Sequence, residues 1–198
     1  MRLRSIALLL AIATPALAQE LPPPAYQLAA QNARVPSVVL FAVALEESGA
    51  RLHGRLIPWP WTLDIAGTPY RYATATTACD ALRLALRSIP ATRIDVGLGQ
   101  VNLGYQSGRY RQPCELLNPY RNLAVAAAIL REQHGAGEDW LLAVGRYHHP
   151  AGGPVAAHYR RRVQDHLARV LGRDRATTAP TPHGFADAAT VQFFDGLP

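Results

Sequence analysis

The chain lacks lysine altogether, so all 20 of its basic side chains are arginines. It also lacks a long basic run: the longest is Arg160-Arg161-Arg162, which falls on a predicted helix. A net charge of +6 that is spread this thinly does not indicate a nucleic-acid-binding protein. A mild positive balance suits contact with a polyanionic surface instead.

Long apolar runs are also missing, and beyond the first 18 residues no stretch is long enough to span a bilayer. Within those 18 residues, Arg2 and Arg4 form a basic start, residues 6–12 are apolar, and residues 16–18 (Ala-Leu-Ala) form a small-residue cleavage site. We therefore predict a signal peptide at 1–18 and an exported, periplasmic protein without stable membrane insertion. A retained N-terminal anchor is the alternative.

Cysteine is scarce, with only Cys79 and Cys114 in the whole chain. An even cysteine number in an exported protein predicts a disulfide between them. Such a bridge would stabilise the fold by roughly 3–4 kcal/mol through the closed loop. Two buried free thiols are the alternative.

The sequence also lacks a metal-ligand pattern and a serine-hydrolase motif. His148, His149 and His158 match no zinc spacing, and no cysteine or carboxylate completes a ligand set, so we predict neither a metal nor another cofactor. The string G-x-S-x-G is missing, so Ser48 is not expected to be a hydrolase nucleophile.

The length favours one domain, and no internal repeat is present. Residues 19–33 begin with three prolines and are expected to form a lead-in segment. The domain itself is expected at 34–172. Residues 173–198 are rich in Thr, Ala and Pro, which predicts a disordered tail.

Periodicity and capping residues predict mostly helices with one small β-hairpin, an α+β fold. The hairpin is expected at 56–73, with a turn at 66–69. The helices are expected from Pro36 to Gly49, from Thr77 with Asp80 as capping partner, from Asn118-Pro119 to Gly135, from Asp139 to about Gly145, and from Pro154 to Gly172.

The segment ALEESGA at 44–50 places two carboxyl groups at the end of an apolar helix. Burial and the helix C-terminus both disfavour a carboxylate there, so they raise its pKa toward that of a general acid. Periodicity does not choose between Glu46 and Glu47, because the helix is apolar on most faces. An ordinary solvated carboxylate is the alternative for either residue.

Two more segments carry polar groups suited to sugar recognition. The stretch DVGLGQVNLGY at 95–105 offers the amides of Gln100 and Asn102 on a Gly-rich turn, and amides both donate to and accept from hydroxyl and acetamido groups. The stretch AVGRYHHP at 143–150 offers Tyr147 beside two histidines. Taken singly, a plain turn and a packed core tyrosine are the alternatives.

Together, the three segments resemble the soluble lytic transglycosylase (SLT) family, lysozyme-like enzymes that cut the glycan strands of bacterial peptidoglycan. The family's acid is followed directly by Ser, which selects Glu47 and leaves Glu46 as a supporting or surface residue. Its Gly-Leu-Met-Gln-Ile/Val-Asn motif is matched except that Gly99 replaces Met. Its Tyr-Asn motif is matched at Tyr147, with His148 in place of Asn. The Asn-Pro-x-x-Asn helix of the family is matched at 118–122, which we interpret as scaffold.

The resemblance implies a lysozyme-like fold over residues 34–172 and a single catalytic carboxyl, that of Glu47. This group acts first as acid and then as base, while the sugar's own 6-hydroxyl attacks and leaves a 1,6-anhydro-muramyl end. It further implies an exported enzyme of the kind that accompanies a secretion, pilus or conjugation apparatus. Tyr147 is expected to hydrogen-bond near the acid and hold it. The substrate-binding residues would be Ser48, Gln100, Asn102, Tyr147 and His148.

Two other functions stay open. A muramidase that uses water needs a second carboxylate, for which Asp64 and Asp95 are the candidates. A non-catalytic glycan-binding or scaffold protein of an envelope-spanning machine needs none. Trp59 and Trp61 suit either sugar stacking or the core of the hairpin.

Overall fold

In the computed structural model, which describes residues 19–173, the apolar segment before Glu46 forms the central helix α2 (Ser37–Ser48). Seven consecutive side chains, at 39–45, are buried, so the helix is enclosed on all sides as its composition predicts. Gly49 ends it, but with a φ of −54° rather than in the left-handed conformation that a terminal glycine usually adopts. The reason is that the chain passes straight from the helix into a strand.

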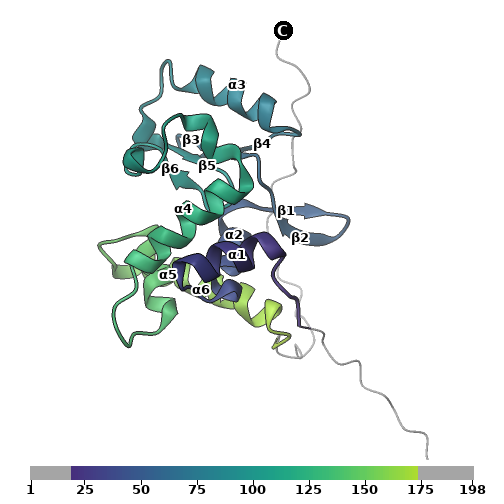
Figure 1. The fold of residues 1–198 in the computed structure, drawn as a ribbon, viewed down its shortest axis with the longest axis vertical. Helices are drawn as coiled ribbons and strands as arrows, with labels where there is room; N and C mark the ends of the chain where they lie inside the picture. Colours follow the sequence, from purple (N-terminus) through teal and green to yellow (C-terminus); the bar gives the residue numbers. More distant parts are fainter. Residues whose placement is uncertain (1–18, 174–198) are drawn as a thin grey trace, which may run out of the picture.

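The molecule has two lobes, and Figure 1 shows helix α4 running from one to the other. One lobe contains α1, α2, α5 and α6, and the other contains a four-stranded sheet with α3. The α+β class is therefore confirmed. The helices are α1 (Pro24–Ala33), α2, α3 (Ala75–Ala85), α4 (Pro119–Glu132), α5 (Trp140–His148) and α6 (Gly153–Val170).

The helical lobe contains one helix that the sequence analysis did not predict. Residues 24–33 of the expected lead-in segment form α1, which begins with Pro24 in its first turn. The ring of Tyr26 on α1 packs edge-on against Phe41 of α2, with ring centres 5.0 Å apart. Glu20, just before α1, pairs with Arg169 of α6 at 2.8 Å. The N-terminal segment therefore belongs to the core.

The second lobe is built on an antiparallel sheet of order β4-β3-β5-β6. The predicted hairpin is its β3–β4 pair, and Ala66 and Gly67 form the turn with positive φ. The strand begins at Thr62, so Trp59 and Trp61 precede it and pack edge-to-face between two hairpins instead of alternating along one strand. The strands are β3 (Thr62–Ile65), β4 (Thr68–Arg71), β5 (Ile94–Val96) and β6 (Val101–Asn102).

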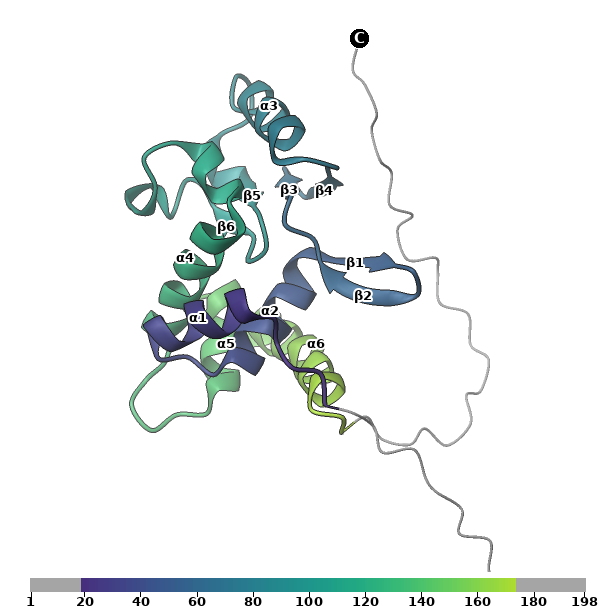
Figure 2. The same ribbon diagram turned by 45° about the vertical axis from the view of Figure 1, so that its right-hand side comes forward.

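A second hairpin, β1 (Gly49–Leu52) with β2 (Arg55–Pro58), projects from the body in both Figure 1 and Figure 2. The sequence analysis missed it. Its two-residue turn has positive φ at His53 and Gly54, the geometry that favours a tight hairpin. The sequence His-Gly is a weaker hairpin signal than Asn-Gly or Asp-Gly, which explains the omission.

The helix caps are predicted correctly in two cases out of three. Asn118 accepts a hydrogen bond from Arg121 N at 3.1 Å to cap α4, and Asp139 accepts one from Leu141 N at 2.8 Å to cap α5. The start of α3 at Thr77 was wrong, because Thr74 is the cap and accepts from the backbone of Thr77 at 3.1 Å. The expected capping partner, Asp80, instead lies 3.7 Å from Arg83.

The predicted disulfide is confirmed: Cys79 on α3 is bonded to Cys114 in the 3-10 turn at 113–117, with Cα atoms 5.4 Å apart. It fastens α3 to the turn that precedes α4. Within the described residues, no single helix is long and apolar enough to cross a membrane, and α1 with α2 meets that test only as a pair bent by 117°. The predicted signal peptide and tail lie outside residues 19–173.

Candidate functional site

A cavity of about 640 Å³ lies between the two lobes. All three sequence segments that resemble the SLT motifs reach it, together with side chains from β3, the β3–β4 hairpin and α4. Its volume is that of a small-molecule or oligosaccharide site. The lining residues are Glu47, Asp64, Pro69, Asp95, Gln100, Val101, Asn102, Tyr105, Gln106, Ile129, Tyr147, His148, His149 and Pro150.

Glu47 lies in the last turn of α2, where its carboxyl group meets the cavity. Burial raises its pKa to about 8, and the negative charges of Glu46 and Asp95 add to that effect. The hydroxyl of Tyr159 donates to Glu47 Oε1 at 2.7 Å and opposes the rise in pKa. Glu47 is therefore protonated at neutral pH and can give a proton to a bound molecule.

Tyr159 on α6 is the tyrosine that holds the acid, and the sequence analysis did not name it as a site residue. Tyr147 was expected in that role, but its hydroxyl donates to the carbonyl of Gly99 at 2.6 Å. Tyr147 still lines the cavity beside Glu47. The sequence could not distinguish the two tyrosines, because only the packing of α6 against α2 decides whether the hydroxyl of Tyr147 or that of Tyr159 reaches the carboxyl of Glu47.

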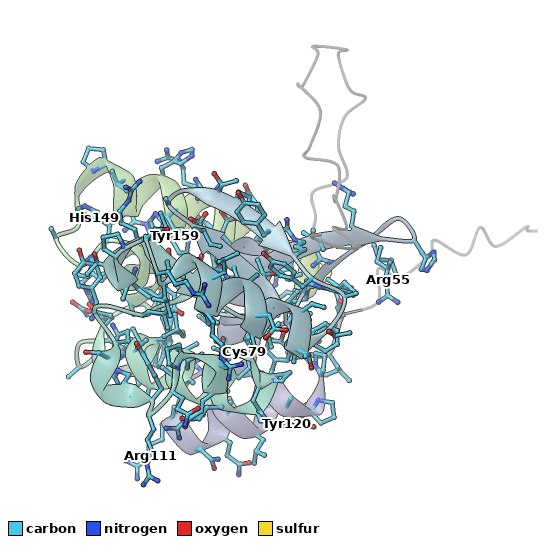
Figure 3. All side chains as sticks on the ribbon, turned by 90° about the horizontal axis from the view of Figure 1, so that it is seen from above. Arg55, Cys79, Arg111, Tyr120, His149 and Tyr159 are labelled. Atoms are coloured by element: carbon cyan, nitrogen blue, oxygen red, sulfur yellow. A yellow bond between two sulfur atoms is a disulfide. The ribbon has the colours of Figure 1, made fainter. Side chains whose placement is uncertain are left out.

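The ring of Tyr159 is itself held by neighbours. His148 stacks on it with ring centres 4.4 Å apart and planes 1° from parallel, and the guanidinium of Arg162 lies 5.7 Å from its centre. Arg162 donates to Glu46, which also contacts His166 at 3.2 Å. Glu46 thus forms an ion-pair cluster with Arg162 and His166. In Figure 3, the labelled Tyr159 and His149 lie at the same end of the molecule.

Ser48 does not line the cavity, contrary to its predicted role in substrate binding. Its side chain is fully buried, and its hydroxyl is shared between the carbonyls of Ala44 at 3.0 Å and Leu98 at 2.9 Å. The residue therefore ties the end of α2 to the Gly-rich turn. Its effect is to place Glu47 against the segment that carries Gln100.

The Gly-rich turn is built around the buried side chain of Asn122 on α4. Asn122 Oδ1 accepts from Gly99 N at 2.8 Å, while Nδ2 donates to the carbonyls of Val96 and Leu116. A Cβ atom at Gly99 would lie 2.6 Å from the side chain of Ala126 and 2.9 Å from the hydroxyl of Tyr147. The close packing explains why a glycine occupies the position where the SLT motif has methionine.

The two amides that were expected to bind substrate line the cavity but are largely engaged within the protein. Gln100 Nε2 donates to the carbonyls of Gly97 at 2.7 Å and Thr62 at 3.2 Å, which leaves Oε1 for a ligand. Asn102 uses its whole amide, donating to Thr92 and Asp95 and accepting from the backbone of 104 and 105. Asn102 is therefore a structural residue of the cavity wall.

Tyr105, which the sequence analysis did not name as a site residue, also lines the cavity. Its backbone N–H donates to Asn102 Oδ1 at 3.0 Å, and its side chain is 77% exposed at the cavity. An exposed aromatic ring offers an apolar face to a sugar. On the opposite segment, partial burial lowers the pKa of His148, and the charge of Arg162 lowers it further, so His148 is neutral at neutral pH.

Both candidates for a second carboxylate lie in the same cavity as Glu47. Asp64 of β3 is paired directly with Asp95 of β5 in the sheet. Burial raises the pKa of Asp95 to about 6, and the charge of Asp64 contributes to the rise, while the hydrogen bond from Asn102 opposes it. Asp95 is therefore ionised at neutral pH, and the same cavity holds a protonated acid at Glu47 and a carboxylate at Asp95.

In the part of the chain that the structure describes, no group of three or more His, Cys, Asp and Glu side chains is placed to hold a metal ion. His149 Nδ1 donates to the carbonyl of Gly152 at 2.9 Å, and His158 Nδ1 lies 3.3 Å from Arg161 Nη2. A comparison of the chain with protein-family models, curated proteins and solved structures finds no match.

Proposed function

We propose that the protein is a peptidoglycan lytic transglycosylase that cleaves the β-1,4 bond between N-acetylmuramic acid and N-acetylglucosamine. The observation that carries this proposal is Glu47: a carboxyl group with a pKa of about 8, open to a cavity between two lobes and oriented by a neutral hydroxyl. A group that is protonated at pH 7 can protonate a glycosidic oxygen, which an ordinary carboxylate cannot.

The chemistry of the cavity supports a saccharide as the ligand. Its wall combines an exposed aromatic ring at Tyr105, a neutral imidazole at His148 and a free amide oxygen at Gln100. Hydroxyl and acetamido groups find donors and acceptors in such a set, and sugar rings find an apolar face.

In the proposed reaction, Glu47 gives its proton to the bridging oxygen while the bond from that oxygen to C1 of the muramyl unit breaks. The resulting carboxylate then takes the proton of the muramyl 6-hydroxyl, whose oxygen forms a new bond to C1. The product is a 1,6-anhydro ring, no water is consumed, and Glu47 returns to its protonated form. Tyr159 keeps the carboxyl in place through both transfers.

A water-using muramidase is the second candidate, and a specific observation favours it. Asp95 and Asp64 line the same cavity as Glu47, so the cavity contains candidates for the second carboxylate that a hydrolase uses. In that reaction, water replaces the 6-hydroxyl and the product carries an ordinary reducing end.

Mass spectrometry of fragments released from purified sacculi separates these possibilities. Anhydro ends are expected, and they should disappear with Glu47→Gln but not with Glu46→Gln. Reducing ends that disappear with Asp95→Asn would establish the muramidase instead. If the wild-type protein releases nothing, a non-catalytic glycan-binding or scaffold role replaces both. The periplasmic location and service to a secretion, pilus or conjugation apparatus are part of the proposal and depend on the predicted signal peptide.

A further inference from the structure

Arg71, at the end of β4, reaches toward the acid from the sheet lobe. Its Nη2 donates to the carbonyl of Gly49 at 2.7 Å, and Gly49 is two residues after Glu47. The Cα atoms of residues two apart are separated by at most about 7 Å. The guanidinium group is therefore held close to the end of α2 that carries the acid.

The register of the hairpin places Arg71 on the face that forms the cavity wall. Arg71 is paired with Thr62, and Pro69 with Asp64, so these four side chains share one face of β3–β4. Asp64 and Pro69 both line the cavity. Arg71 does not itself line the cavity, but it lies one residue pair beyond them on the same face, and its hydrogen bond to the carbonyl of Gly49 holds its guanidinium group at the end of α2.

The positive charge of Arg71 is not compensated within the structure. Its side chain is half-buried, Nε is fully buried without a hydrogen bond, and no carboxylate of residues 19–173 forms an ion pair with it. Burial accordingly lowers the pKa of Arg71. Arg169 also has buried nitrogens without partners, but it is neutralised by Glu20 at 2.8 Å. A partly desolvated cation without a negatively charged partner is unfavourable unless a ligand supplies the opposite charge.

We propose that Arg71 binds a carboxylate carried by the muramyl unit of the glycan, and so selects muramyl-containing strands over neutral ones. This inference rests on the proposed function. Poly-N-acetylglucosamine offers only hydroxyl and acetamido groups, whereas the muramyl unit carries a lactyl substituent beside the bond to be cut. A guanidinium group recognises a carboxylate through charge-assisted hydrogen bonds.

Two sources can supply the carboxylate: the free lactyl group of a strand without peptides, or the acidic groups of an attached stem peptide. The test measures binding to three probes, namely a neutral N-acetylglucosamine hexamer, a muramyl glycan stripped of peptides, and a peptide-bearing strand. Every binding measurement is made on Glu47→Gln protein, so that cleavage does not interfere.

We expect the Glu47→Gln protein to bind at least one muramyl probe about 10-fold to 100-fold more tightly than the neutral hexamer, the range of a hydrogen bond to a charged group. Adding Arg71→Gln should abolish that preference. The muramyl probe that loses affinity identifies the source of the carboxylate. Adding Arg87→Gln, at an exposed position of the sheet lobe, should leave all three affinities unchanged.

Equal weakening for neutral and muramyl probes, or a preference that survives Arg71→Gln, would overturn the proposal. If Arg71→Gln does not fold, Arg71→Met provides the same test with an apolar side chain of similar length. A wild-type protein that cleaves no glycan would overturn the proposed function alone, because the binding preference is measured without cleavage.

Discussion

At the scale of single residues, the proton bound to Glu47 is the feature on which the proposed activity of the site depends. Because its pKa of about 8 is set chiefly by burial, the proposed activity of the wild-type protein should be present below pH 8 and be lost as the pH rises through about 8. With one catalytic carboxyl, no decrease is expected around pH 6, where Asp95 titrates. Initial rates on soluble glycan strands between pH 4.5 and 9.5 test this. A second decrease below about pH 6 would assign a catalytic role to Asp95 and contradict the single-acid mechanism.

The raised pKa of Glu47 also makes the stability of the fold depend on pH. The folded pKa of about 8 lies above the ordinary 4.5, so the folded protein binds the proton more tightly than the unfolded chain does. The stability that this tighter proton binding contributes is fully present below about pH 4.5 and is lost as the pH rises through about 8. Glu47→Gln should therefore unfold like wild type at pH 4.5 and be more stable by about 1–3 kcal/mol at pH 8, reduced by the partial exposure of the side chain. Urea unfolding at the two pH values measures the difference, and equal stability at both would contradict the raised pKa.

Tyr159→Phe keeps the ring that stacks on His148 and removes only the hydroxyl that reaches Glu47. Because that hydrogen bond lowers the pKa of Glu47, its loss should move the alkaline decrease in activity to higher pH. The carboxyl also loses its orientation, so kcat should fall about 10-fold to 100-fold. Tyr110→Phe, which removes a hydroxyl bonded to the carbonyl of Leu103, is the matched control and should leave the pH profile in place. An unshifted profile in Tyr159→Phe would show that the hydroxyl does not act on the acid.

At the scale of elements, the site depends on how closely the Gly-rich turn approaches α4 and α5. Gly99→Ala introduces a Cβ atom 2.6 Å from Ala126 and 2.9 Å from the Tyr147 hydroxyl, so the turn or the helices must shift. Overpacking of this kind costs about 1–3 kcal/mol, and the shift should also lower activity because Gln100 lies in the same turn. Gly108→Ala, where a Cβ atom meets nothing within 4 Å, is the control. Urea unfolding measures the cost, and equal stability of the two variants would refute the packing argument.

The disulfide acts at the scale of the whole molecule, because it restricts the unfolded chain. It joins residues 35 apart in sequence, and neither cysteine lines the cavity between the lobes. Replacing Cys79 and Cys114 together with alanine should lower the free energy of unfolding by about 3–4 kcal/mol. Glycan cleavage at low temperature should persist, since the cavity walls are unchanged. Denaturant unfolding gives the first quantity, and a loss below about 1 kcal/mol would contradict the loop-closure argument.

Local signals in the sequence determined a large part of this structure. An apolar segment ending at a glycine predicted α2, and the caps at Asn118 and Asp139 predicted α4 and α5, because these features depend on neighbours within one helical turn. The cysteine count predicted the disulfide. The three segments that resemble SLT motifs were recognised from residue order alone, and they do meet in one cavity.

Tertiary structure alone decided how the polar groups of those segments are used. Ser48 and Asn102 turned inward to hold the cavity wall, and Tyr159 rather than Tyr147 reached Glu47. The side chain of Arg71 came to the end of α2 only through the register of β3 and β4. Most of these outcomes are set by contacts between residues that are far apart in the sequence. The amide of Asn102 also accepts hydrogen bonds from the backbone of the turn that follows it. No pattern of local propensity carries that information, because it arises when α2, α6 and the sheet pack together.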